Sequence, residues 1–248
     1  MRIGILGTGH IGKTLVRKLS AAGHDVKVAN SRGPHTIDED ILVNGARAVT
    51  SAEAVVGVDV VILSTPLGAI PQISPLLADV PSDTVVIDTS NYYPGRDGVI
   101  AAIEAGQAES EWVAGQLGRP IAKAWNAITS ASFAAKGVVA GTPGRIAIPI
   151  AADGDREREV ATALVNETGL DAVYGGPLIE SWRQQPGAPS YCTDLTREEL
   201  PAALAATDRS RLPKRRDLAI EAIAERVGDS TTNPDSDYAV RLTRVLFM

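Results

Sequence analysis

A glycine-rich segment near the start of the chain has residue types and a spacing suited to binding phosphate groups. Residues 7–12 read GTGHIG, which fits the pattern G-x-G-x-x-G, and they follow a short apolar run. In that context Gly7 permits a tight turn, Gly9 lets the backbone approach a pyrophosphate, and Gly12 lets a helix pack close to the strand. The free N–H groups at the start of that helix attract an anion. We therefore predict a dinucleotide site here, and the alternative is a glycine turn that binds nothing.

The residues after the second apolar run indicate which dinucleotide binds. An NAD site usually has Asp or Glu about 20 residues after the glycines, where it binds the ribose 2′-hydroxyl. This chain has Asn30-Ser31-Arg32 instead, with no acid between Asp25 and Asp38. Arg32 can form a charge-assisted fork with a 2′-phosphate, and Ser31 can donate its hydroxyl. We predict NADP(H) rather than NAD(H); the alternative for Arg32 is an exposed loop arginine without a ligand.

Polar residues end two further apolar runs. Ser64-Thr65-Pro66 ends the fourth run and Asp88-Thr89-Ser90-Asn91 ends the fifth. In open α/β sheets ligands bind at the carboxyl ends of the strands. We expect Ser64, Thr65 and Pro66 beside the cofactor, and the alternative for this segment is a plain turn. We expect Asn91 at the nicotinamide end of the cleft.

The elements that must position these residues alternate along the first 175 residues. Apolar runs are separated by segments with helical spacing, such as the one ended by Gly23 and the one from Asp155 to Gly169. The runs at Val60–Leu63 and Val85–Ile87 are continuously apolar, which is typical of strands buried on both faces. This alternation predicts an α/β fold, namely a Rossmann-type, doubly wound, mostly parallel sheet. The expected strands are Arg2–Leu6, Val26–Ala29, Ala46–Val49, Asp59–Thr65, Thr84–Asp88, Ile121–Trp125, Arg145–Ile150 and Ala172–Tyr174.

The pattern changes after Gly175-Gly176. We expect residues 1–176 to form the NADP-binding Rossmann domain and residues 177–248 to form a small, mostly helical C-terminal appendage. Helices are predicted over Thr196–Ala206, where Thr196 and Glu199 fit a capping box, and over Pro213–Val227. The basic cluster at residues 214–216 reads as the solvated start of the second helix.

Composition excludes several classes of protein. The formal charge of −6 argues against a nucleic-acid partner, and no apolar stretch is long enough to span a membrane. The single cysteine, Cys192, excludes an internal disulfide, and His10, His24 and His35 have no metal-ligand spacing. The N-terminus does not resemble a signal peptide. We expect a cytoplasmic protein that binds no metal.

The sequence resembles a known family. The segments that carry the resemblance occur in the family's order, and they are GTGHIG at 7–12, SR at 31–32, STP at 64–66, DTSNYY at 88–93 and KAWNAI at 123–128. They are similar to those of NADPH-dependent coenzyme F420 reductases, and the cytosolic reductase domains of six-transmembrane ferric reductases share them. The resemblance covers about residues 1–180. It implies a Rossmann domain that holds NADPH and opens its nicotinamide face to a flat redox acceptor, a flavin or deazaflavin.

The resemblance also implies roles for single residues. Thr8, His10 and Ile11 would meet the phosphates, and Ala124, Trp125 and Asn126 would lie next to the nicotinamide. The alternative for the last segment places Trp125 in the core and makes Asn126 a helix cap. The chain after residue 180 is longer than in the archaeal deazaflavin reductases. Residues 180–187 could belong to the acceptor pocket, to a dimer contact or to a packed edge.

The sequence contains no obvious catalytic pair. No tyrosine has a lysine four residues on, so a short-chain dehydrogenase mechanism is not expected. Hydride transfer between stacked rings depends mainly on positioning and needs little acid–base help. Lys123 is the best candidate general acid for a carbonyl or imine substrate, although a structural or surface role is the simpler interpretation.

We therefore expect an NADP-dependent oxidoreductase that transfers hydride between NADPH and a flavin or deazaflavin. One alternative is an NADPH-dependent reductase of a small carbonyl or imine. Another is a redox sensor that binds NADPH without turnover. The expected partner is a small-molecule redox acceptor, and the C-terminal helices could cover the site or form a homodimer.

Overall fold

A computed structural model describes residues 1–228, 232 and 234–248. Within these residues eight strands form one sheet in the order β3-β2-β1-β4-β5-β6-β7-β8. Neighbouring strands are parallel except β6 and β7, which are antiparallel. The strands are β1 (Arg2–Leu6), β2 (Asp25–Ala29), β3 (Arg47–Ala48), β4 (Val60–Leu63), β5 (Val85–Asp88), β6 (Ala122–Lys123), β7 (Ala147–Ala152) and β8 (Asp171–Gly176).

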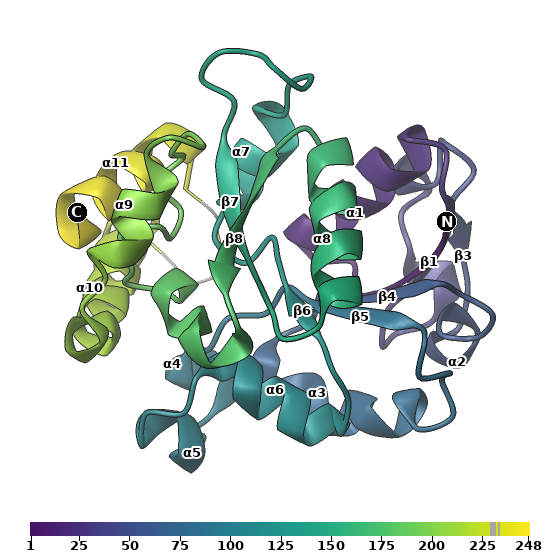
Figure 1. Ribbon diagram of the computed structural model, residues 1–248. Helices are drawn as coiled ribbons and strands as arrows, with labels where there is room; N and C mark the ends of the chain where they lie inside the picture. The colour runs from purple at the N-terminus through teal and green to yellow at the C-terminus, as the bar shows by residue number, and fades with distance from the viewer. Residues whose placement is uncertain (229–231, 233) are drawn as a thin grey trace.

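Helices cover both faces of this sheet, as a doubly wound fold requires (Figure 1). The α-helices are α1 (His10–Ala21), α2 (Ser51–Ala54), α3 (Ile70–Ile73), α4 (Pro94–Asp97), α5 (Ala101–Glu104), α6 (Glu109–Leu117), α7 (Ser130–Ala135), α8 (Asp155–Glu167), α9 (Leu200–Ala205), α10 (Leu212–Val227) and α11 (Ser236–Phe247). The 3-10 helices are η1 (Pro34–Thr36), η2 (Glu39–Ile41), η3 (Leu67–Ala69), η4 (Ser74–Leu77), η5 (Leu178–Gln184) and η6 (Arg209–Arg211).

The two faces of the sheet bury separate apolar clusters. One cluster joins the strands to α1, α7 and α8, for example through Leu15, Phe133 and Leu164. The other joins them to α2, α3 and α6, for example through Ile70 and Val113. Each fully buried aliphatic side chain contributes about 1.5–3 kcal/mol. The continuously apolar runs in β4 and β5 are buried throughout because both faces are covered. The predicted Rossmann-type fold is confirmed.

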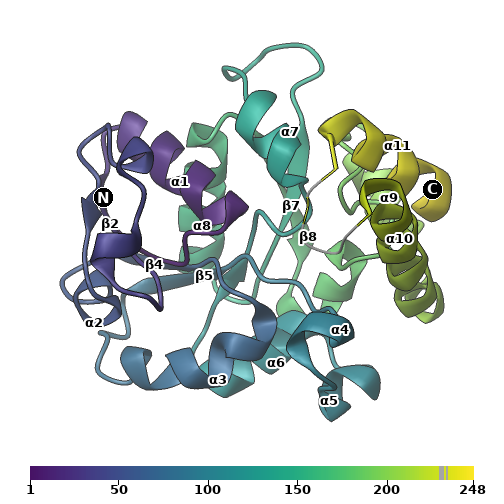
Figure 2. The ribbon, with the colours of Figure 1, turned by 180° about the vertical axis from the view of Figure 1, so that it is seen from behind.

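The C-terminal helices gather at the β8 end of the sheet (Figures 1 and 2). Helix α9 packs on β7 and β8, where Leu200, Ala203 and Leu204 cover Ala147. Helix α10 lies against α11, and α11 also contacts α7. The C-terminal helices therefore pack against the sheet domain. The proposed boundary between residues 176 and 177 stays a prediction.

One predicted helix begins later than its sequence suggests. Thr196 forms an isolated bridge with Ile146, and its N–H donates to Oε2 of Glu199 over 2.9 Å. Half of the predicted capping box is present, but the bridge holds Thr196 in extended backbone. The helix α9 therefore begins at Leu200 instead of Thr196.

Among the described residues, no helix is long and apolar enough to cross a membrane.

Candidate functional site

The glycine turn places its three glycines in three different environments. Gly7 has a φ of +114°, and a Cβ on it would lie 2.1 Å from the carbonyl oxygen of Ser64. A Cβ on Gly12 would lie 2.1 Å from the carbonyl oxygen of Gly7. Gly9 differs, because a Cβ there would meet no protein atom within 4 Å. Gly7 and Gly12 are thus required by the fold, whereas Gly9 keeps the space in front of the turn open.

Helix α1 begins at this open space. Its first turn has no side-chain cap and no acidic residue. The first helical hydrogen bond runs from Lys13 N–H to the carbonyl oxygen of Gly9, so the N–H groups before it have no partner within the helix. His10 is exposed at the first helical position, and Thr8 lies partly buried before it. The turn and the helix start therefore have the electrostatics of an anion site.

The segment after β2 is held by an asparagine that the sequence did not single out. Asn30 Nδ2 donates to Oγ1 of Thr36 over 2.9 Å and to Oγ1 of Thr8 over 3.3 Å. Its Oδ1 accepts the backbone N–H of Arg32 over 2.9 Å. The side chains of Ser31 and Arg32 are exposed, and among the described residues no acid pairs with Arg32. Asn30 thus fixes the turn that presents a free guanidinium.

These segments and the end of β4 surround one cavity of about 460 Å³, which we call the turn cavity. Thr65 contributes a buried hydroxyl that has no hydrogen-bond partner among the described residues. An open glycine, an orphaned hydroxyl and a free arginine fit the phosphate-bearing end of a dinucleotide. The lining residues are Leu6, Gly7, Thr8, Gly9, Ala29, Asn30, Ser31, Arg32, Ser51, Ser64, Thr65, Pro66, Ala69, Gln72 and Ile73.

A second cavity of about 240 Å³ lies at the carboxyl ends of β5 and β6, and we call it the helix-covered cavity. Asn91 and Asn126 line it from the sheet, and Ile11 lines it from the start of α1. Ala219 and Ile223 of α10 and Phe247 of α11 cover it. The C-terminal helices therefore enclose the region where a ring bound beyond the glycine turn would lie.

The amide of Asn126 is already saturated inside the protein. Its Nδ2 donates to Oδ1 of Asn91 over 3.1 Å and to the carbonyl oxygen of Gln184 over 2.8 Å. Its Oδ1 accepts Nε2 of Gln184 over 2.9 Å, and its own carbonyl oxygen accepts Nδ2 of Asn91 over 2.9 Å. This network fastens η5 to the ends of β5 and β6. The placement of Asn91 and Asn126 beside a nicotinamide stays a prediction.

Ala124 and Trp125 point into the core. Both side chains are fully buried in the cluster under α1, α7 and α8. Trp125 Nε1 donates to Oγ1 of Thr168 over 3.1 Å, and its φ of 55° is unusual for a residue other than glycine. The core alternative is therefore correct for Trp125, although this residue also lines the helix-covered cavity. It is wrong for Asn126, because Thr129 is the N-cap of α7. The placement of Ala124 and Trp125 beside a nicotinamide stays a prediction.

Two tyrosines form the polar part of the helix-covered cavity. The hydroxyls of Tyr93 and Tyr191 are 2.7 Å apart, and Asn91 Nδ2 donates to the Tyr191 hydroxyl over 3.3 Å. Burial raises the pKa of both phenols and that of the Cys192 thiol. Of the described side chains that line this cavity, only Arg216 is charged near neutral pH. The cavity therefore contains no carboxylate, lysine or histidine among those residues.

Lys123 is a buried structural residue. Its Nζ donates to Oδ2 of Asp88 over 2.6 Å and also to the carbonyl oxygen of Ser90. Both charged side chains are essentially inaccessible. Glu109 lies nearby, and burial raises its pKa to about 7, although the charge of Lys123 opposes this rise. The suggestion that Lys123 is a surface residue is wrong, because it is paired in the core.

The basic cluster at the start of α10 is only partly solvated. Lys214 is exposed, but Arg216 is 8% exposed and lines the helix-covered cavity. The solvated interpretation is therefore wrong for Arg216. Arg216 has helical spacing from Leu212, Ala219 and Ile223, so it lies on the buried face of α10. This spacing can be recognised in the sequence.

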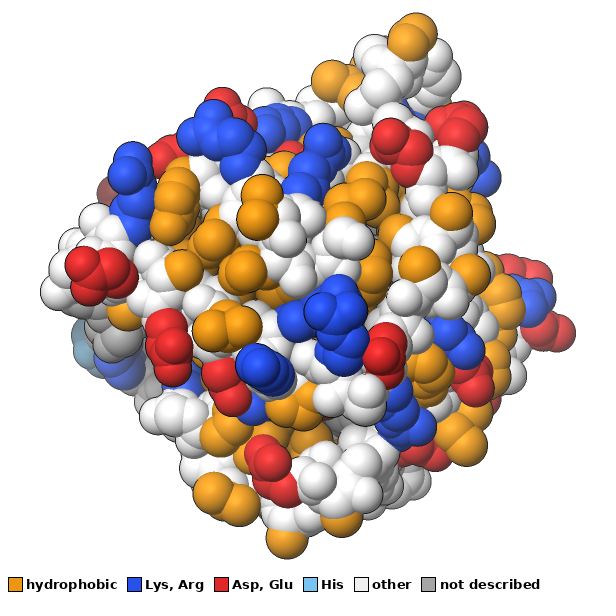
Figure 3. All heavy atoms as spheres, turned by 90° about the vertical axis from the view of Figure 1, so that its left-hand side faces the viewer, with side chains coloured by type: hydrophobic (Ala, Val, Ile, Leu, Met, Phe, Trp, Pro, Cys, Tyr) orange, Lys and Arg blue, Asp and Glu red, His pale blue; other side chains and the backbone are white. Residues whose placement is uncertain are grey.

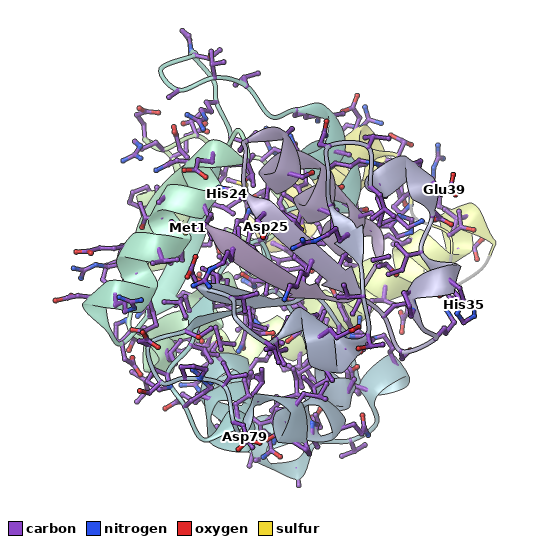
Figure 4. The ribbon with its side chains drawn as sticks, turned by 90° about the vertical axis from the view of Figure 1, so that its right-hand side faces the viewer. Met1, His24, Asp25, His35, Glu39 and Asp79 are labelled. Carbon is purple, nitrogen blue, oxygen red and sulfur yellow. The ribbon has the colours of Figure 1, made fainter. Side chains whose placement is uncertain are left out.

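No group of three or more potential metal ligands is found among the described residues. Figure 4 shows His24 beside Met1 and Asp25, with His35 on a separate segment. His24 Nδ1 lies 3.0 Å from the N-terminal nitrogen, and its Nε2 lies 2.5 Å from Oε2 of Glu167. Its contacts are those of a structural histidine.

Sequence comparison with known proteins finds one family and one relative, each of which matches part of this chain. Residues 2–92 match the family described as NADP oxidoreductase coenzyme F420-dependent. The protein YjhV of Escherichia coli (strain K12) is 37% identical over 99 residues, which is 38% of this chain and 69% of that protein. The family match at residues 2–92 includes the glycine turn and strands β1 to β5.

Solved structures match over most of the chain. The protein SMa0349 from Sinorhizobium meliloti has a TM-score of 0.68 and 25% identity, covering 79% of this chain and 96% of that one. A protein from Arthrobacter sp. FB24 assigned as an F420-dependent NADP reductase has a TM-score of 0.57 and 17% identity, covering 95% and 98%. The 3-hydroxyisobutyrate dehydrogenase of Mycobacterium tuberculosis has a TM-score of 0.52 and 19% identity, covering 93% and 68%. The last two likenesses show the fold alone.

Proposed function

Since the chain belongs to the NADP oxidoreductase coenzyme F420-dependent family, we propose that it transfers hydride between NADPH and the ring of a flavin or deazaflavin. The family members are NADP-dependent oxidoreductases, which counts against a sensor without turnover. The observation that carries the choice of acceptor is the lining of the helix-covered cavity. Its described side chains include no carboxylate, lysine or histidine that could exchange protons near neutral pH.

In this proposal the turn cavity holds the adenosine end of NADPH. Arg32 and Ser31 bind the 2′-phosphate, and the N–H groups at the start of α1 bind the pyrophosphate. Thr8, Ser64, Thr65 and Pro66 line this cavity, and Ile11 lines the helix-covered cavity beyond the turn. We expect His10 and Ile11 to meet the phosphates between the two cavities. The orphaned hydroxyl of Thr65 gains a hydrogen-bond acceptor when the cofactor is bound.

The nicotinamide end of the cofactor then lies toward the helix-covered cavity, where the reduced ring supplies the hydride. A flavin or deazaflavin ring accepts hydride and spreads the charge over its own nitrogen and oxygen atoms, so the protein need not donate a proton at once. The protein contributes position and the exclusion of water. The Tyr93–Tyr191 pair offers hydrogen bonds to a planar acceptor, and Asn91 positions Tyr191 by donating to its hydroxyl. Phe247 and Ile223 keep the site apolar.

A small carbonyl or imine is the second candidate acceptor, and one observation favours it. The hydroxyls of Tyr93 and Tyr191 form a short pair that lines the cavity and that stays protonated near neutral pH. A phenol of this kind can donate a proton to a developing alkoxide. If this candidate is correct, Tyr93→Phe and Tyr191→Phe should lower kcat for a carbonyl substrate at least about a hundredfold, the low end of general acid catalysis.

The experiment that tests the proposal mixes the protein with NADPH and a panel of acceptors. The panel contains riboflavin, FMN, a deazaflavin, a ferric chelate and small carbonyl and imine compounds, and the reduced-nicotinamide absorbance is followed. We expect oxidation of NADPH with the flavin and deazaflavin. Replacing both tyrosines by phenylalanine should raise KM for these acceptors, because their hydrogen bonds are lost, but should leave kcat nearly unchanged. Turnover with carbonyl compounds alone would support the second candidate, and no turnover with any acceptor would contradict both.

A further inference from the structure

Glu109, the first residue of α6, buries a carboxylate oxygen that has no hydrogen-bond partner. The residue is 3% exposed, and its Oε2 makes no hydrogen bond among the described residues. The buried Lys123 is engaged elsewhere, because its Nζ donates to Asp88 and to the carbonyl oxygen of Ser90. An unpaired buried polar atom is costly, and nearly all such atoms are paired in proteins. Glu109 therefore offers a hydrogen-bond acceptor to an N–H group of a ligand.

Gln185 offers the complementary group, a hydrogen-bond donor. The residue is 9% exposed, and its buried Nε2 has no hydrogen-bond partner among the described residues. Gln185 directly follows η5, whose last residue, Gln184, donates from Nε2 to Oδ1 of Asn126 over 2.9 Å. This bond fixes the chain beside Gln185. The amide of Gln185 is therefore available to a carbonyl oxygen of a ligand.

Both side chains line one small cavity of about 110 Å³, which we call the side cavity. Since Oε2 of Glu109 and Nε2 of Gln185 both have no partner among the described residues, they do not bond to each other. A group that carries an N–H beside a C=O would satisfy both. The side cavity has several times the volume that one water needs, but it is smaller than the space a fused ring system requires. It is lined by Tyr92, Ile103, Glu104, Gly106, Gln107, Glu109, Gln185, Pro186, Arg209, Leu212, Pro213 and Arg216.

The side cavity adjoins the helix-covered cavity. Arg216 and Pro186 line both of them, so these two residues form the boundary. Arg216 is held there by Asp217, whose Oδ1 accepts its Nε over 2.8 Å, and its guanidinium carbon lies 5.5 Å from the centre of the Tyr92 ring. A planar molecule that is seated in the helix-covered cavity therefore has a polar space for its edge on the other side of Arg216.

Charged groups on three other elements act on Glu109. Burial has the largest effect and raises the pKa of Glu109 to about 7. Lys123 of β6 and Arg216 of α10 oppose this rise, whereas Asp88 of β5 adds to it. Glu109 therefore changes from neutral to ionised near neutral pH, and the ionised form is the stronger acceptor for an N–H group.

The remaining polar groups around the side cavity have partners of their own. Glu104 of α5 accepts the hydroxyl of Tyr92 over 2.9 Å, and Arg209 of η6 donates to the carbonyl oxygen of Gly106. Burial raises the pKa of the Tyr93 phenol, and the charge of Glu109 adds a smaller rise. Figure 3, which faces the C-terminal helices, shows Lys and Arg side chains interspersed with Asp and Glu, so no field of one sign dominates that side of the molecule.

We propose that Glu109 and Gln185 bind the imide edge of the acceptor ring, which is the C(=O)–NH–C(=O) edge of its pyrimidine part. Glu109 accepts the N–H, and Gln185 donates to a neighbouring carbonyl oxygen. The rest of the ring lies in the helix-covered cavity, and Arg216 stands beside the part of the ring that gains negative charge with the hydride. This inference rests on the proposed function, because it assigns one edge of the same acceptor. It predicts that the natural acceptor has an unsubstituted imide.

The test compares riboflavin with 3-methylriboflavin, in which a methyl group replaces the hydrogen of the imide N–H. Binding is measured by quenching of flavin fluorescence on protein saturated with NADP⁺, so that the dinucleotide site is filled. We expect riboflavin to bind roughly ten- to a hundredfold more tightly, the range for a hydrogen bond to a charged group. Equal affinity for the two flavins would mean that the side cavity holds water only, and it would overturn the proposal.

The pH dependence of binding gives a second readout on the native protein. Because the ionised form of Glu109 accepts the N–H, the affinity for riboflavin should rise about tenfold between about pH 6 and about pH 8, as a group with a pKa of about 7 goes from about one tenth to about nine tenths ionised. The affinity for 3-methylriboflavin should not rise. A riboflavin profile that is as flat as that of the methylated flavin would contradict the role of Glu109.

Two variants connect the preference to the named side chains. Glu109→Leu should lower the affinity for riboflavin to that for 3-methylriboflavin and should abolish the rise with pH. Gln185→Leu should weaken both flavins by several fold and keep their ratio, because both retain the carbonyl groups. Glu111→Leu is the matched control, since Glu111 lies on the same helix and lines neither cavity.

The outcomes separate this subsite from the proposed function. A preference for riboflavin that survives in Glu109→Leu would show that the methyl group acts by its bulk alone, and it would overturn the subsite. If Glu109→Leu does not fold, the pH profile of the native protein decides. A preference that Glu109 controls, without any NADPH oxidation, leaves the subsite standing and refutes the proposed function. Oxidation with the same KM for both flavins does the reverse.

Discussion

Replacing Arg32 with alanine should remove most of the preference for NADPH over NADH. Arg32 is exposed on a turn that Asn30 fixes, and no acid among the described residues competes for its guanidinium. Asp38 is paired with Lys13, which lowers the pKa of its carboxyl, and the charge of Arg32 adds a smaller lowering of that pKa. The guanidinium is therefore free for a 2′-phosphate.

The magnitude follows from exposure. A charge-assisted hydrogen bond contributes about 1.5–3 kcal/mol, and solvent at an exposed site brings the value toward the lower end. We expect Arg32→Ala to weaken NADPH binding about tenfold, which corresponds to about 1.4 kcal/mol, and to leave NADH binding unchanged. The preference of the native protein should also shrink as salt is raised, because the pair is screened at a Debye length of about 10 Å in 0.1 M salt.

The assay is the quenching of tryptophan fluorescence, or calorimetry, with each reduced nucleotide at two salt concentrations. Arg158→Ala is a suitable control, because Arg158 is a partly exposed arginine of α8 that lines neither the turn cavity nor the helix-covered cavity. Equal affinity of the native protein for NADPH and NADH would refute the assignment of Ser31 and Arg32. An Arg32→Ala variant with an unchanged ratio of affinities would refute it as well.

Three further predictions concern the fold around the site. Gly7→Ala should unfold the protein or destabilise it by more than about 1 kcal/mol in urea titration, whereas Gly9→Ala should stay folded and lose NADPH affinity. A stable Gly7→Ala variant together with an unfolded Gly9→Ala variant would contradict the turn geometry. Lys123→Met should cost about 3–5 kcal/mol because it leaves Asp88 buried without its partner, and a second change, Asp88→Leu, should recover much of the loss. Burial raises the pKa of Glu109 from 4.5 to about 7, so the folded state binds this proton more tightly than the unfolded state. The stability that it contributes is fully present below pH 4.5 and is lost as the pH rises to about 7, and a Glu109→Gln variant whose urea stability keeps the same pH slope would disprove this.

The parts of the fold that depend on local pattern could be predicted from the sequence. The apolar runs in β4 and β5 are one such pattern, because a strand buried on both faces needs consecutive apolar residues. The glycine turn is another, because its backbone conformation and close packing require glycine at fixed positions. The start of α9 could not be predicted, because the bridge between Thr196 and Ile146 joins residues 50 positions apart in sequence.

The candidate site also has residues that the sequence could predict and residues that it could not. The position of Ser31 and Arg32 could be predicted because they come directly after a strand. The hydrogen bonds of the Asn126 amide could not, because they depend on Gln184, which is 58 residues away in the sequence. Lys123 could not be placed in the core without knowing that Asp88 neutralises it there. Arg216 is an intermediate case. Its helical spacing from apolar residues predicted a buried position, but its place in a run of basic residues suggested a solvated one.

The most direct test of the account follows the hydrogen itself. NADPH carrying deuterium at one or the other face of the nicotinamide C4 is incubated with the protein and a deazaflavin, whose reduced ring keeps the transferred hydrogen on carbon, and the product is analysed by mass spectrometry. We predict a product with one deuterium from one of the two labelled forms and none from the other. An unlabelled product from both forms, or no reduced deazaflavin at all, would contradict direct hydride transfer by this protein.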